Sequence, residues 1–97
     1  MLLLLDCYIK SSPAEYKGNV STTVSNRTCQ RWDTETPHEP HASEVDPSNH
    51  PDGDIHHNFC RSPDKDDQPW CYTIDPDEQL DYCDIPECGK YIVFLSS

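Results

Sequence analysis

The chain has 97 residues, among them six cysteines, nine prolines and three glycines, and 18 acidic against 7 basic side chains give it a formal net charge of -11. A chain of this length has room for one domain with a thin core, and its cysteine content predicts three disulfides formed in an oxidising, extracellular compartment. The charge argues against nucleic acid or an anionic membrane as partner, because both are bound through Lys and Arg, and it favours basic ligands.

The two ends of the chain are apolar but short. Residues 1–6 resemble the stump of a signal peptide that lacks a basic n-region. Residues 89–97 form a short apolar tail, far below the roughly 20 residues that cross a bilayer as a helix. We therefore expect a piece of a longer secreted protein, divided into a stump at 1–6, a domain at 7–88 and a tail at 89–97. The two ends are expected either to pair as a short ribbon or to fray.

Between these ends, no window has the apolar spacing of a confident helix, and prolines recur. Short β-like runs between chain breakers predict strands within residues 7–9, 20–24, 70–74 and 82–85. Residues 34–54 hold four prolines and almost no apolar side chain except Val45, which predicts a long surface loop with cysteines at its base. The sequence thus predicts a small disulfide-rich fold made mostly of loops, with short strands and little or no helix.

The six cysteines are widely spaced. They are Cys7, Cys29, Cys60, Cys71, Cys83 and Cys88, with 21, 30, 10, 11 and 4 residues between successive members. No Cys-x-x-Cys couple is present, so a zinc site is poorly supported, and six cysteines that pair off leave no free thiol for catalysis. Fifteen pairings remain open on spacing alone.

Seven short segments around these cysteines carry more information. They are Asp6-Cys7-Tyr8, Tyr16-Lys17-Gly18, Cys29-Gln30-Arg31-Trp32, Pro37-His38, Asn58-Phe59-Cys60-Arg61-Ser62-Pro63-Asp64, Pro69-Trp70-Cys71-Tyr72-Thr73 and Tyr82-Cys83-Asp84-Ile85-Pro86-Glu87-Cys88. In this order and at this spacing they resemble the kringle family, an extracellular module with three disulfides, over residues 7–88.

The resemblance implies the kringle fold, with short antiparallel strands and the pairing Cys7 with Cys88, Cys29 with Cys71 and Cys60 with Cys83. It also implies that a set of apolar side chains surrounds the inner disulfides, namely Tyr16, Trp32, Ile55, Trp70 and Ile85. Where kringles commonly have a glycine in the turn before the second cysteine, this chain has Ser25-Asn26. Asparagine tolerates a left-handed turn, so the same turn is expected.

Lysine-binding kringles hold their ligand in an open trough, and the resemblance maps most of that trough onto this chain. Its anionic end falls on Asp64 and Asp66 and two aromatic walls fall on Trp70 and Tyr72, while Leu80 stands where a third wall is usually tryptophan. These five residues are called the trough below. The positions that commonly carry basic residues hold Gln79, Glu39 and Ala42 instead, so the cationic end is missing.

This half-complete trough leaves two interpretations open. In one, it binds an amine, such as an internal lysine of a protein, by carboxylates and apolar faces but not a zwitterion. In the other, the acidic turn is merely solvated and is satisfied by Lys65 or Arg61.

The remaining polar clusters are weaker signals. Adjacent residues in an extended segment point to opposite faces, so His56 and His57 are expected to be one surface and one packed histidine rather than a metal pair. Asp52-Gly53-Asp54 lacks the ligand spacing of a calcium loop, and no catalytic signature is present. Asn19-Val20-Ser21 and Asn26-Arg27-Thr28 are glycosylation sequons, of which Asn26 lies in a predicted turn.

We therefore expect a secreted, non-catalytic and monomeric module that binds extracellular proteins, without metal or cofactor. One alternative is the regulatory fragment of a kringle-containing zymogen of a trypsin-like serine protease. Another is a disulfide scaffold without ligand, from a receptor or growth-factor ectodomain.

Overall fold

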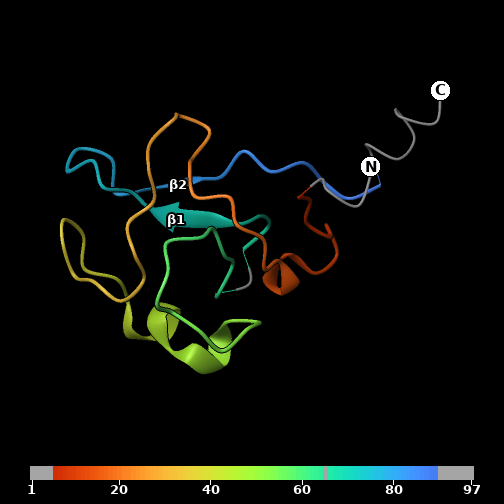
Figure 1. The fold of residues 1–97 in the computed structure, drawn as a ribbon, viewed down its shortest axis with the longest axis horizontal. Coiled ribbons are helices and arrows are strands. Elements are labelled where there is room, and N and C mark those ends of the chain that lie inside the picture. Colours follow the sequence, from red (N-terminus) through yellow and green to blue (C-terminus); the bar gives the residue numbers. More distant parts are fainter. Residues whose placement is uncertain (1–5, 65, 90–97) are drawn as a thin grey trace.

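The computed structural model describes residues 6–64 and 66–89, and the statements below concern these residues. They form a small disulfide-rich fold of loops around one antiparallel two-stranded sheet, made of β1 (Trp70–Tyr72) and β2 (Leu80–Tyr82) (Figure 1). In the register Trp70 faces Tyr82, Cys71 faces Asp81 and Tyr72 faces Leu80. The predicted fold class is confirmed. The terminal ribbon suggested by the sequence lies outside the described residues.

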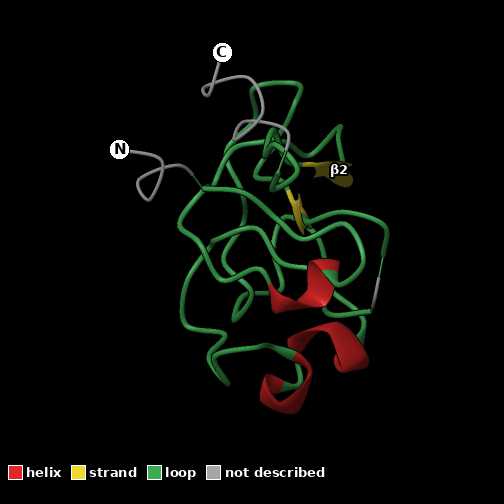
Figure 2. Cartoon of the chain, turned by 90° about the vertical axis from the view of Figure 1, so that its right-hand side faces the viewer, coloured by secondary structure: helices red, strands yellow, loops and turns green. Residues whose placement is uncertain are grey.

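Three short 3-10 helices complete the regular structure: η2 (Pro13–Glu15), η3 (Ala42–Val45) and η4 (Pro47–Asn49). Proline opens η2 and η4, where its fixed φ suits a helical turn and its missing N–H is not needed. Figure 2 shows the helical turns gathered at one side of the molecule. The first and last described residues lie together at one end of the long axis (Figure 1), where Cys7 and Cys88 join them.

The predicted strands are only partly regular. Residues 70–74 contain β1, whereas the prediction for 82–85 is wrong in its bounds, because β2 covers residues 80–82 and its partner strand ends opposite Leu80. The runs at 7–9 and 20–24 make isolated bridges instead, with Tyr8 opposite Glu87 and Thr23 opposite Cys83. Chain turns held by disulfides leave too few consecutive extended residues for longer ladders.

Residues 34–54 are not simply a surface loop. This segment contains η3 and η4, and it buries Glu44 and His50 against the domain. The His50 ring nitrogen Nε2 lies 2.7 Å from the Glu44 carbonyl oxygen, so the two buried residues are joined directly. The prediction failed here because the inward side chains are polar and carry no apolar signal.

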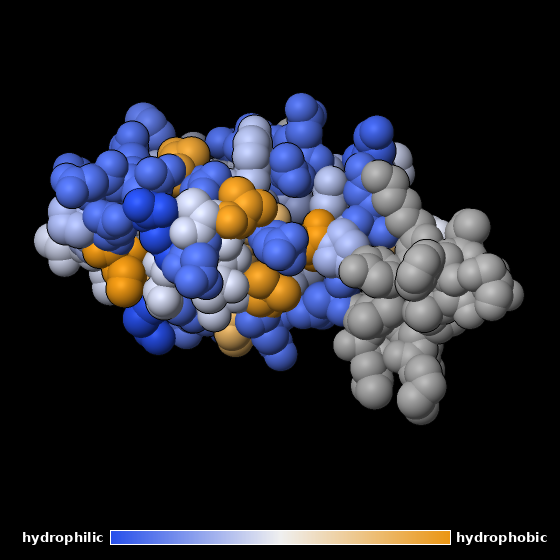
Figure 3. Space-filling model, turned by 90° about the horizontal axis from the view of Figure 1, so that it is seen from above, coloured by the Kyte–Doolittle hydropathy of each residue, from blue (hydrophilic) through white to orange (hydrophobic). Residues whose placement is uncertain are grey.

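The outer surface is dominated by polar side chains. Seen from above, apolar residues form separate small patches within a hydrophilic surface (Figure 3). No helix among residues 6–64 and 66–89 is long and apolar enough to cross a membrane.

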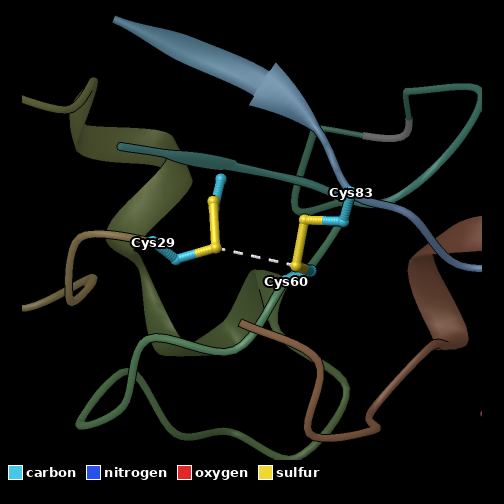
Figure 4. Close-up of side chains that lie close together, drawn as sticks. Cys29, Cys60 and Cys83 are labelled. Carbon is cyan, nitrogen blue, oxygen red and sulfur yellow. Dashed lines mark hydrogen bonds between the residues drawn. A yellow bond between two sulfur atoms is a disulfide. The ribbon is translucent and has the colours of Figure 1, made fainter. Parts of the chain in front are cut away.

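The centre of the fold is a pair of disulfides in contact. The pairing implied by the resemblance is confirmed: Cys7 with Cys88, Cys29 with Cys71 and Cys60 with Cys83. The Sγ atoms of Cys29 and Cys60 lie 3.7 Å apart, so the two inner bridges pack against each other beside β1 (Figure 4). Their four sulfur atoms lie within 4.8 Å of one another, but each is bonded to its partner cysteine and none is a free thiolate ligand.

Aromatic rings pack around these bridges. Trp32 makes edge-to-face contacts with Trp70 and Tyr72, at ring-centroid distances of 5.3 and 6.3 Å. Tyr16 and Ile85 are buried in the same cluster, and Ile55 packs against it from a partly buried position, as the resemblance implies.

The expected left-handed turn is present as well. Asn26 has a φ of 65°, so asparagine takes the conformation for which glycine is the usual choice.

A buried arginine ties two loops to this core. The Arg61 side chain is 1% exposed, and its guanidinium donates to the carbonyls of Gly18 and Cys60 and to Asp52 Oδ2, at 2.9, 2.7 and 3.1 Å. Partial burial raises the pKa of Asp52, but the hydrogen bond and charge of Arg61 outweigh this and hold that pKa below its ordinary value. The pair therefore stabilises the fold while Asp52 is ionised.

We predict that Asp52→Asn lowers the free energy of unfolding at pH 7 by about 1.5–3 kcal/mol, the range for a hydrogen bond to a charged group. Because the folded-state pKa of Asp52 is depressed, its contribution is complete above the ordinary value of 3.8 and is lost as pH falls through the folded-state pKa. Urea unfolding should therefore show the variant and the native chain converging below that pH. Asp77→Asn, an exposed control, should change stability by less than about 0.5 kcal/mol. Equal stability of both variants at pH 7 would contradict the prediction.

Candidate functional site

The strand pair brings the trough residues together. Trp70 and Tyr72 are two positions apart on β1, and Leu80 faces Tyr72 across the sheet. The Trp70 indole Nε1–H donates to Asp64 Oδ1 at 3.3 Å, which places the acidic turn beside the first aromatic wall. Four of the five trough residues are thus neighbours on the strand pair and its adjoining turn, namely Asp64, Trp70, Tyr72 and Leu80.

The two aromatic walls are covered, however. Trp70 and Tyr72 are each only 2% exposed, because their rings pack against each other and against Trp32. The apolar surface that solvent reaches belongs to β2 instead, where Leu80 is 45% and Tyr82 is 42% exposed. An incoming alkyl chain would therefore meet Leu80 and Tyr82 before it met either buried ring.

The sequence comparison with kringles did not single out Tyr82. It lies two residues after Leu80 on β2 and faces Trp70 across the sheet. Alternate residues of a strand share one face, so the Leu-Asp-Tyr pattern of residues 80–82 is the signal that could have identified it.

A second unpredicted residue lies on the other side of Tyr72. Glu44 is 6% exposed, and its Oε1 accepts a hydrogen bond from the Tyr72 hydroxyl at 2.5 Å and from the His41 backbone N–H at 3.1 Å. Burial and this hydrogen bond raise the pKa of Tyr72. Ala42, at a position that carries a basic residue in the family, opens η3, and two residues later η3 turns Glu44 inward. The family commonly has basic residues at this end of the trough. Here the sequence has none, and the acidic side chain of Glu44 lies nearby instead.

At the acidic end of the trough, burial and neighbouring negative charges both disfavour ionisation of Asp66. Burial raises the pKa of Asp66, and the charge and hydrogen bond of Asp64 raise it further, followed by smaller contributions from Asp67 and Glu44. Within residues 6–64 and 66–89, no Lys or Arg forms an ion pair with Asp64 or Asp66. Such a carboxylate pair gains from any cation that approaches it.

The two basic residues suggested as internal partners can be placed separately. Arg61 donates to Asp52 and to two backbone carbonyls, and it forms no ion pair with Asp64 or Asp66. Lys65 lies outside the described residues.

The paired histidines are separated by the fold. His56 is exposed and its Nδ1 lies 3.1 Å from Asp33 Oδ2. His57 is buried and its Nδ1 accepts the Phe59 backbone N–H, while burial and the neighbouring Arg61 lower its pKa. Their side chains serve different parts of the structure and do not converge on one metal position.

Comparison with known families agrees with this geometry. A family model described as a kringle domain matches residues 7–88. The match spans all three disulfides and every residue of the trough.

We predict that Tyr72→Phe lowers the free energy of unfolding by about 1–3 kcal/mol, because Glu44 would lose a donor while staying buried. Tyr82→Phe is the matched control, since it removes a hydroxyl from a largely exposed ring, and it should change stability by less than about 0.5 kcal/mol. Urea unfolding of the two variants at neutral pH measures the difference. If the two substitutions have the same effect, the Tyr72 to Glu44 bond is not a stabilising contact.

Proposed function

Because the chain belongs to the kringle domain family, whose members are non-catalytic modules that mediate protein interactions, we propose that it is an extracellular module that binds basic side chains. The ligand is an amine without a nearby carboxylate, and its natural form is an internal lysine of a protein partner. The amine lies against Asp64 and Asp66, and its methylenes lie along Leu80 and Tyr82.

The observation that carries this proposal is the acidic end formed by Asp64 and Asp66, with which no Lys or Arg among residues 6–64 and 66–89 forms an ion pair. Burial and the neighbouring charge of Asp64 raise the pKa of Asp66, which is the reason that a bound ammonium ion would be stabilised there. A lysine side chain offers that ammonium on an apolar stem, which suits exposed apolar side chains beside a carboxylate pair.

The charges around the trough also disfavour ligands that carry a carboxylate as well as an amine. A lysine-like zwitterion carries a carboxylate several ångströms from its amine, and here that group would meet Gln79 and buried Glu44 rather than a base, since Glu39 lines a pocket beside Trp32. Like charge at that end weakens binding. The site therefore discriminates against free lysine and C-terminal lysine and favours lysines within a chain.

Affinity is expected to be low. Leu80 has no π-face, and cation–π attraction to an exposed ring contributes about 0.5–1 kcal/mol, so its absence weakens binding by roughly two- to fivefold. An interaction of this strength suits a module that acts together with others in one protein.

The two alternatives make different demands. A regulatory fragment of a serine protease zymogen requires an activation site and a protease domain in the parent sequence beyond residue 97. A ligand-free scaffold requires that no amine perturbs the trough at any accessible concentration. The absence of an ion pair to Asp64 or Asp66 among the described residues favours the binding module over the scaffold.

We predict that hexylamine binds the native chain more tightly than an ω-amino acid of equal chain length, as measured by NMR shifts of Leu80 and Tyr82. The folded-state pKa of Asp66 is raised, so its carboxylate is lost as pH falls through that raised value, and amine binding should start to weaken above pH 3.8. Asp66→Asn should weaken hexylamine binding by about tenfold or less, the range of one exposed ion pair. Asp77→Asn is the charge-matched control and should have little effect. Preference for the amino acid would overturn the proposal.

The same site offers a gain-of-function test. Gln79→Arg places a base at the end where the family commonly has one, so it should strengthen binding of the ω-amino acid while leaving hexylamine binding nearly unchanged. Leu80→Trp should instead strengthen both by a similar factor, because it adds a ring that contacts only the amine end. Identical effects of the two substitutions on the two ligands would show that the trough is not the binding surface.

We also propose that the protein is secreted and carries glycan at Asn26 rather than Asn19. Both asparagines are exposed, but Asn26 lies at the tip of a tight turn with φ of 65°, whereas the Asn19 backbone N–H is held by Asp6 Oδ2 at 3.3 Å in a segment that also bonds the Tyr16 hydroxyl. Glycosidase treatment of protein secreted from eukaryotic cells should reduce its mass, and Asn26→Gln should remove the shift while Asn19→Gln should not. An unchanged mass after treatment of the native protein would refute glycosylation.

A further inference from the structure

A pocket lined by Trp32, the ring that contacts both Trp70 and Tyr72, and by none of the trough residues is the feature that the proposed function leaves unexplained. It measures about 450 Å³, within the range of small-ligand sites. Its floor is apolar, formed by Trp32, Val45 and Ile55. Its rim is acidic, with side chains of Asp33, Glu35 and Glu39, and no Lys or Arg among the described residues lines it.

The three carboxylates at the rim differ in whether they already have hydrogen-bond or ion-pair partners. Asp33 is bound by Arg31, whose Nε and NH2 donate to its two oxygens at 2.9 and 2.7 Å, and by His56, and these hydrogen bonds lower its pKa. Glu35 and Glu39 are exposed, and among the residues that the structure describes neither side chain makes a hydrogen bond or ion pair. Two carboxylates thus face the pocket mouth with no partner of their own.

The wall that carries these two glutamates is held in place. Buried Gln30 lies next to the disulfide Cys29 and fastens the loop with its side-chain amide, which donates to the carbonyls of Thr34 and His38 and accepts the His38 N–H. These three bonds have lengths of 3.3, 2.7 and 3.0 Å. Glu35 lies within the fastened segment 34–38 and Glu39 directly follows it, so the backbone that presents their charges is preorganised.

The opposite wall and the floor are fixed as well. Ala42 and Val45 belong to η3, which is anchored by the bond between buried Glu44 and Tyr72. The Trp32 indole Nε1–H donates to the Phe59 carbonyl at 2.8 Å, which holds the floor ring in one orientation. A rigid pocket costs little ordering entropy when a ligand enters.

We propose that this pocket binds an arginine side chain of a protein partner, independently of the amine site at the trough. The apolar floor and the two free carboxylates define the ligand: it must be cationic, and its charged group must tolerate partial loss of water. A guanidinium meets both demands, because it is weakly hydrated, planar and able to direct its five N–H donors to carboxylates on different sides. An ammonium is compact and strongly hydrated, so it loses more on approaching an apolar floor.

Residue-resolved NMR titration of the whole chain tests the proposal. The probes are three blocked peptides, acetyl-Gly-X-Gly-amide with X as arginine, lysine or citrulline, the last being a neutral counterpart of arginine with similar shape. The arginine peptide should shift the Trp32 indole N–H and the methyls of Val45 and Ile55 and bind at least about fivefold more tightly than the lysine peptide. Citrulline should shift none of these signals. Signals of Leu80 and Tyr82 report the trough separately, so failure at one site is distinguishable from failure at the other.

Substitutions identify the charges responsible. Glu35→Gln with Glu39→Gln should weaken arginine binding by about tenfold, the combined effect of two exposed ion pairs. Asp77→Asn with Asp84→Asn changes the net charge equally at exposed residues that do not line the pocket, and it should leave the affinity within about twofold. Ala42→Lys, at an exposed lining position, should abolish binding by placing a cation at the mouth.

Three results would overturn the inference. One is equal binding of the arginine and lysine peptides, which removes the guanidinium preference. Another is equal weakening by the two double substitutions, which would show attraction to the net charge alone. The third is the absence of any shift at Trp32, Val45 and Ile55 up to saturating arginine peptide.

Discussion

The contact between the two inner disulfides is the constraint on which the rest of the molecule depends. Cys29 and Cys60 touch through their sulfur atoms, and their partners Cys71 and Cys83 lie at β1 and directly after β2. The bridges close loops with sequence separations of 42 and 23 residues, for which the chain-entropy model gives about 3–4 kcal/mol each, an upper limit for overlapping loops. A sheet of two three-residue strands would be marginal alone. Crosslinked, it becomes the platform against which Trp32, Trp70 and Tyr72 pack.

Polar anchors then extend this small platform outward to the loops. Arg61 fastens the chain around Gly18 and Asp52, Gln30 fastens residues 34–38, and Glu44 fastens η3 to β1. Each anchor is buried and hydrogen-bonded, as a polar group must be if its burial is not to destabilise the fold. A domain with few apolar residues therefore organises its long loops by hydrogen bonds to the core, which frees the outward side chains to carry the charge of -11.

A structural feature could be predicted from the sequence where it is determined by neighbouring residues, and not where it depends on residues far away in the chain. The disulfide pairing, the buried aromatics and the left-handed Asn26 follow from short segments beside the cysteines, and the structure confirms them. The burial of Glu44 could not be predicted, because an acidic residue in a proline-rich segment has no local reason to turn inward. Its reason is the Tyr72 hydroxyl, 28 residues away in sequence. The burial of Trp70 and Tyr72 likewise depends on tertiary contacts, because Trp32 and η3 must be in place to cover the two rings.

The aromatic stack also relates the two surfaces that are proposed to bind ligands. Trp32 contacts Trp70 and Tyr72 of the trough by its edge and contributes to the floor of the second pocket. Two neighbouring residues of η3 also serve different sites: Glu44 accepts the hydrogen bond of Tyr72, and Val45 lines the second pocket. The two sites therefore share a rigid support but have separate charges, Asp64 and Asp66 for one and Glu35 and Glu39 for the other. A partner with a lysine and an arginine at suitable separation would engage both, and the second contact would then form at a high effective concentration. Two weak sites on one small domain can in this way give a selectivity that neither has alone, because a partner with only one basic residue gains nothing from the second.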